Sequence, residues 1–344
     1  MVASWVRVSA LVLAACQLPA SSPEAVAEAA RGKALAQEGK YELAIQHYKA
    51  ALKLDSHLPG LYLNLGLAYF KSKQLPEAAA AFEEAIRAEP ANFQARTLLG
   101  MSYYGAAKYD LAAKQLKAAT ELQPDNLELR YTLAQSYLWS EQYAEAIAEF
   151  RFLLSKNPDS GAVHVLLGEV LDAANRAAEA IAEFEAAVKS APSQPEVHFG
   201  LGYLYWKQQR YQEACREFEA ELRSQPQHVQ ALSYLGDAEM RLNDEKAAEG
   251  HLRRVVTLDP NARLAHLDLG ILLAGRNESE AAVQHFRAAI RIDPSKPDAH
   301  YRLGRLWKSM GHDREAQAEF EQVKKLASEE SPAPLIRLPG RKDP

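Results

Sequence analysis

Apolar and polar positions along the chain recur with a period of 34 residues. Each period carries an invariant alanine, a glycine twelve residues before it in eight of the nine copies, and in most copies a closing proline. Nine periods fit between residues 25 and 330 without an insertion, so the repeat is the organising feature of the sequence. The alanines are Ala44, Ala78, Ala112, Ala146, Ala180, Ala214, Ala248, Ala282 and Ala316.

Each period predicts two helices. Apolar residues stand at helical spacing in both halves, as Leu65 and Tyr69 do before Phe82 in the second repeat. The small residues Gly66 and Ala78 let the paired helices approach closely, and a proline at the end of the repeat stops the second helix. One such pair cannot bury its apolar face alone, so neighbouring repeats must stack into a continuous core.

These positions resemble the tetratricopeptide repeat (TPR). The resemblance implies an all-α fold, a right-handed superhelical α-solenoid of nine helix-turn-helix repeats. The seventh repeat departs from the pattern, with Glu239 and Glu245 where tyrosine is usual. In the sixth repeat the pattern is carried by Leu201, Gly202, Tyr205, Tyr211, Ala214, Phe218 and Pro226.

The two ends of the chain fall outside the repeats. Residues 1–15 contain one basic residue, Arg7, and then an apolar run that is too short to span a bilayer and is typical of a secretory signal. We expect a flexible linker over residues 16–24, the repeats over 25–330, and a proline-rich, disordered tail over 331–344. That tail, or the bare end of the array, is also a candidate surface for self-association.

The signal ends in Leu13-Ala14-Ala15-Cys16, which resembles the lipobox of bacterial lipoproteins. The resemblance implies that Cys16 is lipidated and becomes the mature N-terminus, which is the only membrane attachment we expect. Gln17 then favours an outer-membrane lipoprotein that faces the periplasm. Two alternatives stay open: ordinary cleavage near Ala20, giving a soluble periplasmic or secreted protein, or an unprocessed apolar tail.

Composition and motifs argue against several functions. A net charge of −5 without a basic stripe excludes a duplex-binding surface, so no nucleic acid is expected as a partner. Two cysteines exclude a disulfide framework and a multi-thiolate zinc site. Gly200 and Gly202 lack the third glycine and the preceding strand of a dinucleotide-binding loop. No nucleophile or acid–base constellation is present, so we expect a non-enzyme without cofactor or metal.

Four histidines share one position of the repeat. Equivalent helices of successive repeats are separated by packed helices about 8–10 Å apart, whereas two ligands of one zinc ion lie at most about 4 Å apart. We therefore expect packing at repeat interfaces rather than a shared metal. The four residues are His164, His198, His266 and His300.

The resemblance implies a groove lined by the first helix of each repeat, at positions 2, 5, 9, 12 and 13. Eight of these 45 positions are aromatic, compared with 8% of the chain, which favours a surface that holds a partner. Packing of some of these rings on adjacent helices is the alternative. The predicted partner-binding residues are Leu63, Leu67, Phe70, Tyr104, Tyr131, Trp139, Phe199, Tyr203 and Trp206.

These features predict a non-catalytic protein–protein interaction scaffold of the bacterial cell envelope. It would bind a protein or peptide segment of unknown identity in its groove. The alternative is an accessory assembly subunit of an envelope enzyme or of a glycan- or pilus-export complex. The asparagine ladder of glycosyltransferase-associated arrays is not supported, because repeat position 6 holds residues such as Tyr234, Asp268 and Arg302.

Overall fold

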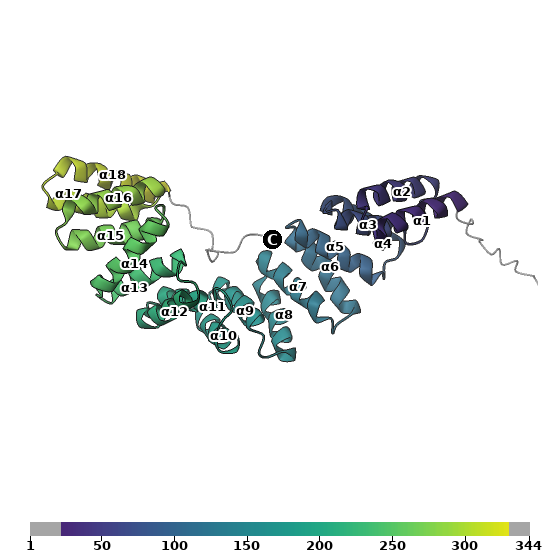
Figure 1. Cartoon of the computed structure of the whole chain (residues 1–344), viewed down its shortest axis with the longest axis horizontal. Coiled ribbons are helices and arrows are strands. Elements are labelled where there is room, and N and C mark those ends of the chain that lie inside the picture. Colours follow the sequence, from purple (N-terminus) through teal and green to yellow (C-terminus); the bar gives the residue numbers. More distant parts are fainter. Residues whose placement is uncertain (1–21, 330–344) are drawn as a thin grey trace, which may run out of the picture. The chain divides into compact units, whose positions relative to one another are not determined.

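The computed structural model of the chain describes residues 22–329, and every regular element in that range is a helix. The predicted all-α array of helix pairs is therefore confirmed, with two helices in each 34-residue repeat (Figure 1). The predicted signal, Cys16 and the tail lie outside the described residues. Helix α1 begins at Pro23, so the last two residues of the predicted linker are helical; Ser22 caps this helix by accepting from the Ala25 N–H.

The chain divides into two compact units, an N-terminal unit over residues 1–132 and a C-terminal unit over residues 133–344, and the division falls within α7 (Leu127–Trp139). The N-terminal unit also contains α1 (Pro23–Gln37), α2 (Tyr41–Leu54), α3 (Leu61–Lys71), α4 (Leu75–Ala88), α5 (Phe93–Gly105) and α6 (Tyr109–Leu122).

The C-terminal unit continues in the same way. It contains α8 (Tyr143–Lys156), α9 (Gly161–Ala173), α10 (Ala177–Ser190), α11 (Val197–Lys207), α12 (Tyr211–Ser224), α13 (Val229–Arg241), α14 (Glu245–Leu258), α15 (Arg263–Gly275), α16 (Ser279–Ile292), α17 (Pro297–Ser309) and α18 (Asp313–Glu329). No helix among residues 22–329 is both long enough and apolar enough to cross a membrane.

Glycine and a large apolar residue hold each helix pair together. A Cβ built on Gly66 would lie 2.5 Å from the Phe82 ring, and one on Gly168 would lie 2.6 Å from Phe184. Phe82 and Phe184 are fully buried, so these rings lie directly on the glycine backbone. This contact confirms the predicted close approach of the two helices.

Gly200 adds a second contact of this kind, this time between repeats. Its Cβ would lie 2.4 Å from Phe184 of the preceding repeat, whereas Gly202 packs on Phe218 of its own repeat. The Gly-x-Gly sequence is therefore explained by helix packing on both sides of α11.

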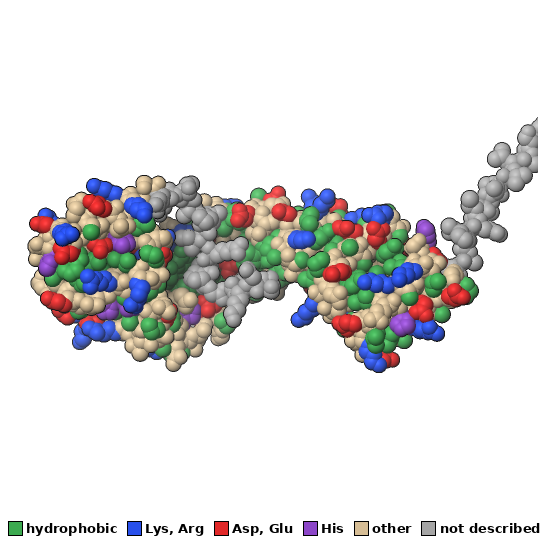
Figure 2. Space-filling view, turned by 90° about the horizontal axis from the view of Figure 1, so that it is seen from above, with side chains coloured by type: hydrophobic (Ala, Val, Ile, Leu, Met, Phe, Trp, Pro, Cys, Tyr) green, Lys and Arg blue, Asp and Glu red, His purple; other side chains and the backbone are tan. Residues whose placement is uncertain are grey.

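Successive odd-numbered helices contact each other in both units: α1 contacts α3 and α3 contacts α5 in the N-terminal unit, and α11 to α17 form such contacts in the C-terminal unit. We call the side of each unit that these helices form its inner face. On the molecular face seen in Figure 2, acidic and basic side chains are interspersed over both units, with apolar side chains between them. No single-sign field appears on this face.

Candidate functional site: the inner faces of the two units

The inner face of the N-terminal unit is mainly apolar. Leu63, Leu67 and Phe70 of α3 are half-buried and pack against the core of the first three repeats. Met101 of α5 is 37% exposed. The half-buried Tyr104 lies beside it on the same helix, its ring edge-on to Tyr109 at 5.5 Å between centroids. These predicted groove residues thus form a partly accessible apolar surface.

Two further predicted residues lie on α7. Tyr131 belongs to the N-terminal unit and Trp139 to the C-terminal unit, and each side chain is half-buried. Both rings keep some accessible surface, as a contact residue requires.

Two predicted partner-binding residues belong to the core instead. Phe199 is 2% exposed and Tyr203 is 5% exposed. The Phe199 ring lies 4.9 Å from the ring of His228, the last residue of its own repeat, and 6.1 Å from that of Tyr234 in the next repeat. Both rings are enclosed by other rings of the core, so they offer no surface to a partner. The structure therefore corrects the prediction for these two residues: they are packing residues between repeats, which was the alternative interpretation.

Trp206, by contrast, is half-buried at the edge of this aromatic cluster. Its ring meets Tyr234 edge-on at 4.9 Å and stacks on Tyr203 at 6.1 Å. The indole N–H donates to Oδ2 of Asp237 at 2.5 Å. Because the carboxylate is 3% exposed, this charge-assisted bond fixes both side chains on the inner face of the C-terminal unit.

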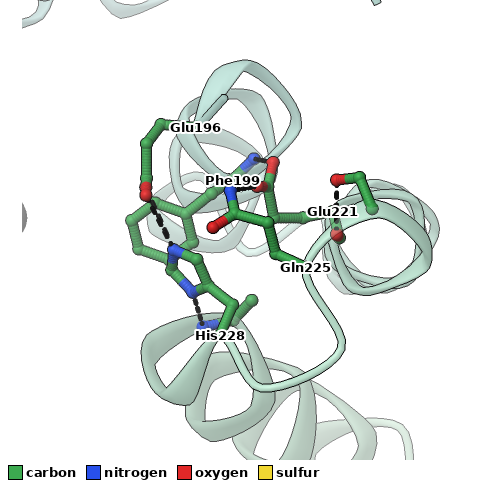
Figure 3. A network of polar contacts seen from close by, with 7 residues as sticks. Glu196, Phe199, Glu221, Gln225 and His228 are labelled. Carbon is green, nitrogen blue, oxygen red and sulfur yellow. Dashed lines mark hydrogen bonds and ion pairs between the residues drawn. The ribbon is translucent and has the colours of Figure 1, made fainter. Parts of the chain in front are cut away.

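A polar network supports the start of α11 (Figure 3). Glu221, which is 1% exposed, accepts from the backbone N–H of Phe199 at 3.2 Å and from Gln225 Nε2 at 2.6 Å. The first N–H groups of a helix have no partner within the helix, so a carboxylate there satisfies one of them. Both carboxylate oxygens of Glu221 are thereby hydrogen-bonded.

His228 joins the same region to the next helix. Its Nδ1 accepts from the N–H of Ala231 in α13, so the proton of the neutral ring stands on Nε2, which donates to Glu196 at 3.0 Å. Glu196 itself has φ of 67°, in the left-handed region that disfavours side chains with a Cβ. The network positions α11 and α13, which carry Trp206 and Asp237.

Sequence reasoning missed the acidic residues of this face. Asp237 and Asp268 are each 3% exposed, and Oδ2 of Asp268 is buried without a hydrogen-bond partner. Burial, together with the Asp237 charge, raises the pKa of Asp268 well above its usual value, although Arg241 and Arg302 oppose the shift. Asp268 stands at repeat position 6. The signal in the sequence was the presence of charged residues, Asp268 and Arg302, at this position of two successive repeats.

The predicted histidine ladder consists of pairs within repeats. His164, His198 and His300 each contact, through Nδ1, a glutamate nineteen residues later, at 2.6–2.7 Å. His266 instead meets His285 at 3.0 Å, and burial lowers the pKa of His285. His164 and His266 also contact proline carbonyls of the preceding repeat through Nε2, which makes these two interface residues as predicted. No group of ligands fit for a metal ion occurs among residues 22–329.

Cys215 of α12 is a half-buried free thiol. Burial, followed by the charges of Glu239 and Glu219, raises its pKa to about 12. Since the thiolate is the reactive form, this cysteine stays protonated and unreactive at neutral pH.

Comparison with known proteins agrees with this architecture. The sequence matches the family described as tetratricopeptide repeat over residues 63–126, 131–195 and 199–263, and again over 103–151. A family described as TPR repeat matches residues 32–73 and 272–311. The first of these matches alone covers more than half of the chain. The chain belongs to the tetratricopeptide repeat family.

One of the similar solved structures has a TM-score above 0.5 and shows the same fold. The C-terminal part of a TPR repeat-containing protein from Cytophaga hutchinsonii is 16% identical, with a TM-score of 0.59 over 69% of this chain and 98% of that one. MamA from AMB-1 is 27% identical over 49% of this chain and 99% of its own, with a TM-score of 0.44. YrrB, described as a TPR protein with an unusual peptide-binding site, is 23% identical over 52% and 92%, with a TM-score of 0.43. No curated protein matches the chain.

Membership of this family supports a role in protein–protein interaction, because TPR proteins bind protein or peptide partners and are generally non-catalytic scaffolds. The fold explains why: each repeat adds one inner helix, and the inner helices together present a continuous surface.

Proposed function

We propose that this protein is a non-catalytic scaffold that binds a peptide or an extended partner segment along its inner faces. The observation that carries the proposal is the apolar inner face of the N-terminal unit. Leu63, Leu67 and Phe70 leave part of their apolar surface accessible there, and Met101 is 37% exposed. Exposed apolar side chains grouped on one face mark an interaction site more often than scattered ones do.

The contact residues in this proposal are those that keep accessible surface. Phe199 and Tyr203 support the surface from beneath. The contact residues are Leu63, Leu67, Phe70, Met101, Tyr104, Tyr131, Trp139 and Trp206.

Site-specific crosslinking in cells tests this function. A photoreactive amino acid replaces Met101 on the inner face or, as a matched control, Leu258, which is 38% exposed on the even-numbered helix α14. We expect a defined crosslinked partner from position 101 and none from position 258. The same partner at equal yield from both positions, or no partner from position 101, would contradict an inner-face site.

We also propose that the scaffold acts in the bacterial cell envelope, anchored through a lipid on Cys16. Support comes from the sequence: one basic residue, an apolar run of signal length, and a lipobox-like end. Mass spectrometry of the mature N-terminus is the test. We expect a diacylated or triacylated Cys16, and an unmodified chain that starts after Ala20 would refute the anchor.

A further inference from the structure

Two buried carboxylates lie together on the inner face of the C-terminal unit. Asp237 is on α13 and Asp268 is on α15, two helices in contact, and each residue is 3% exposed. Removing a carboxylate from water is costly unless it is paired and hydrogen-bonded. The N-terminal unit's inner face contains no comparable pair among its described residues.

The hydrogen bonding of these two carboxylates is incomplete. Asp237 uses Oδ2 to accept from Trp206, and Oδ1 has only a 3.3 Å contact with Nε of Arg241. The Arg241 side chain is 57% exposed, so it covers Asp237 from the solvent side and is not a buried partner. Oδ2 of Asp268 has no hydrogen-bond partner at all. A buried polar atom left in this state in a folded protein calls for a missing donor.

The surroundings favour a cation as that donor. The Trp206 and Tyr234 rings border Asp237, and aromatic faces beside a carboxylate attract positive charge. Burial raises the pKa of Tyr234 to about 12, so its hydroxyl adds no negative charge of its own. Arg241 already places a guanidinium at the outer oxygen of Asp237, which shows that a positive group fits there.

We propose that Asp237 and Asp268 receive a lysine or arginine side chain of the bound partner. The incoming cation displaces the exposed Arg241 side chain from Oδ1 of Asp237, enters through the opening that this leaves, and hydrogen-bonds to Oδ2 of Asp268. The site rests on the proposed scaffold function and specifies its partner chemistry. The partner segment that binds the C-terminal unit must carry a positively charged side chain.

A direct titration tests the site without knowledge of the partner. The probes are N-acetyl-arginine amide and N-acetyl-lysine amide, with N-acetyl-citrulline amide and N-acetyl-norleucine amide as uncharged controls. The readout is the indole N–H signal of Trp206 in the purified full-length protein, assigned by its loss in Trp206→Phe. Because this N–H donates to Asp237, it reports any new charge at that carboxylate.

We expect a saturable shift with at least one cationic probe and none with its neutral counterpart. Asp268→Asn should weaken binding about tenfold or more, because the amide loses the charge that strengthens the bond. Arg241→Gln should strengthen binding severalfold by removing the competing guanidinium. Asp172→Asn is the matched control, since Asp172 is an inner-face carboxylate paired with Lys207 at 2.7 Å; it should leave the titration unchanged.

Three results would overturn the proposal. The first is an equal shift with charged and neutral probes, and the second is no shift with any probe. The third is an Asp268→Asn variant that binds the cationic probe like the wild type. Crosslinking from position 101 separates this failure from failure of the scaffold. A crosslinked partner together with no titration refutes the cation site alone. Titration without any crosslinked partner refutes the proposed function alone.

Discussion

The inner faces of the two units share one repeat pattern and differ in chemistry. In the N-terminal unit, positions 5, 9 and 12 of the second repeat are Leu63, Leu67 and Phe70, all half-buried and uncharged. In the C-terminal unit the same positions of the sixth repeat are Phe199, Tyr203 and Trp206; the first two are buried, and the third bonds a carboxylate. The 34-residue framework therefore fixes where the side chains stand, while neighbouring repeats decide whether they reach the surface.

The inner faces of the two units also differ in their charged side chains. Ion pairs join inner helices of the C-terminal unit, as Lys207 of α11 bonds Asp172 of α9 and Arg263 of α15 bonds Asp298 of α17. These pairs neutralise the four side chains that form them, whereas Oδ2 of Asp268 has no hydrogen-bond partner. One face is thus suited to apolar side chains, and the other to a specific charged one.

The largest test of this difference compares Phe199→Ala with Leu63→Ala, two substitutions at repeat position 5. Phe199 is fully enclosed, so its loss should reduce the free energy of unfolding by about 3–5 kcal/mol. Leu63 is half-buried and should cost only about 1 kcal/mol. Chemical denaturation measures both. Equal costs would mean that Phe199 is accessible, and the contrast between the faces would disappear.

Trp206→Phe gives the next largest effect. Phenylalanine keeps an aromatic ring against Tyr203 and Tyr234 but removes the indole N–H that Asp237 accepts. A lost bond to a buried charged group costs about 1.5–3 kcal/mol. Trp307→Phe is the comparison, since Trp307 of α17 is also half-buried and its ring contacts His312 and Arg287. A similar loss of stability in both variants would remove the special role of the Trp206–Asp237 bond.

The sequence predicts the framework well for a physical reason. The contact between Gly66 and Phe82 lies within one repeat, so it is visible in the 34-residue period itself. The burial of Phe199 depends on Tyr234 in the next repeat, at a position where the nine repeats of this chain share no residue type. The bond from Trp206 to Asp237 spans 31 residues and needs a side-chain orientation that no periodicity supplies. Contacts between repeats are therefore the part of the site that the sequence does not determine by pattern.

Asp268→Asn should stabilise the protein at neutral pH. The folded-state pKa of Asp268 is raised by burial, so between the unfolded value near 4 and the folded value the folded state holds a proton that the unfolded state has lost. Stability due to this residue therefore falls as pH rises through that window and stays low above it. We expect a gain of about 1 kcal/mol or more in the variant above the window, which vanishes at lower pH.

Thermal melts of both proteins across a pH series measure this gap. A gap independent of pH would show that Asp268 does not titrate with folding. Gained stability together with lost probe binding is the pattern expected of a residue kept for function rather than for the fold.

The last comparison concerns repeat position 2, where the units again differ. Gly60 and Glu196 both precede a helix in the left-handed region, with φ of 70° and 67°. Glutamate there costs about 1–2 kcal/mol relative to glycine, but Glu196 recovers part of this through its bond to His228. In the N-terminal unit the position of His228 is taken by Asn92, whose side chain already caps Ala95 and pairs with Glu89.

Reciprocal substitutions separate the two contributions. Gly60→Glu should lose about 1–2 kcal/mol of unfolding free energy, because the new carboxylate gains no histidine partner. Glu196→Gly should change stability by less than about 1 kcal/mol, since relief of the backbone strain and loss of the His228 bond oppose each other. Denaturation of the two variants beside the double variant gives these values. A large loss of unfolding free energy in Glu196→Gly would mean that the bond to His228, and not the turn, holds α11 and its Trp206 in place.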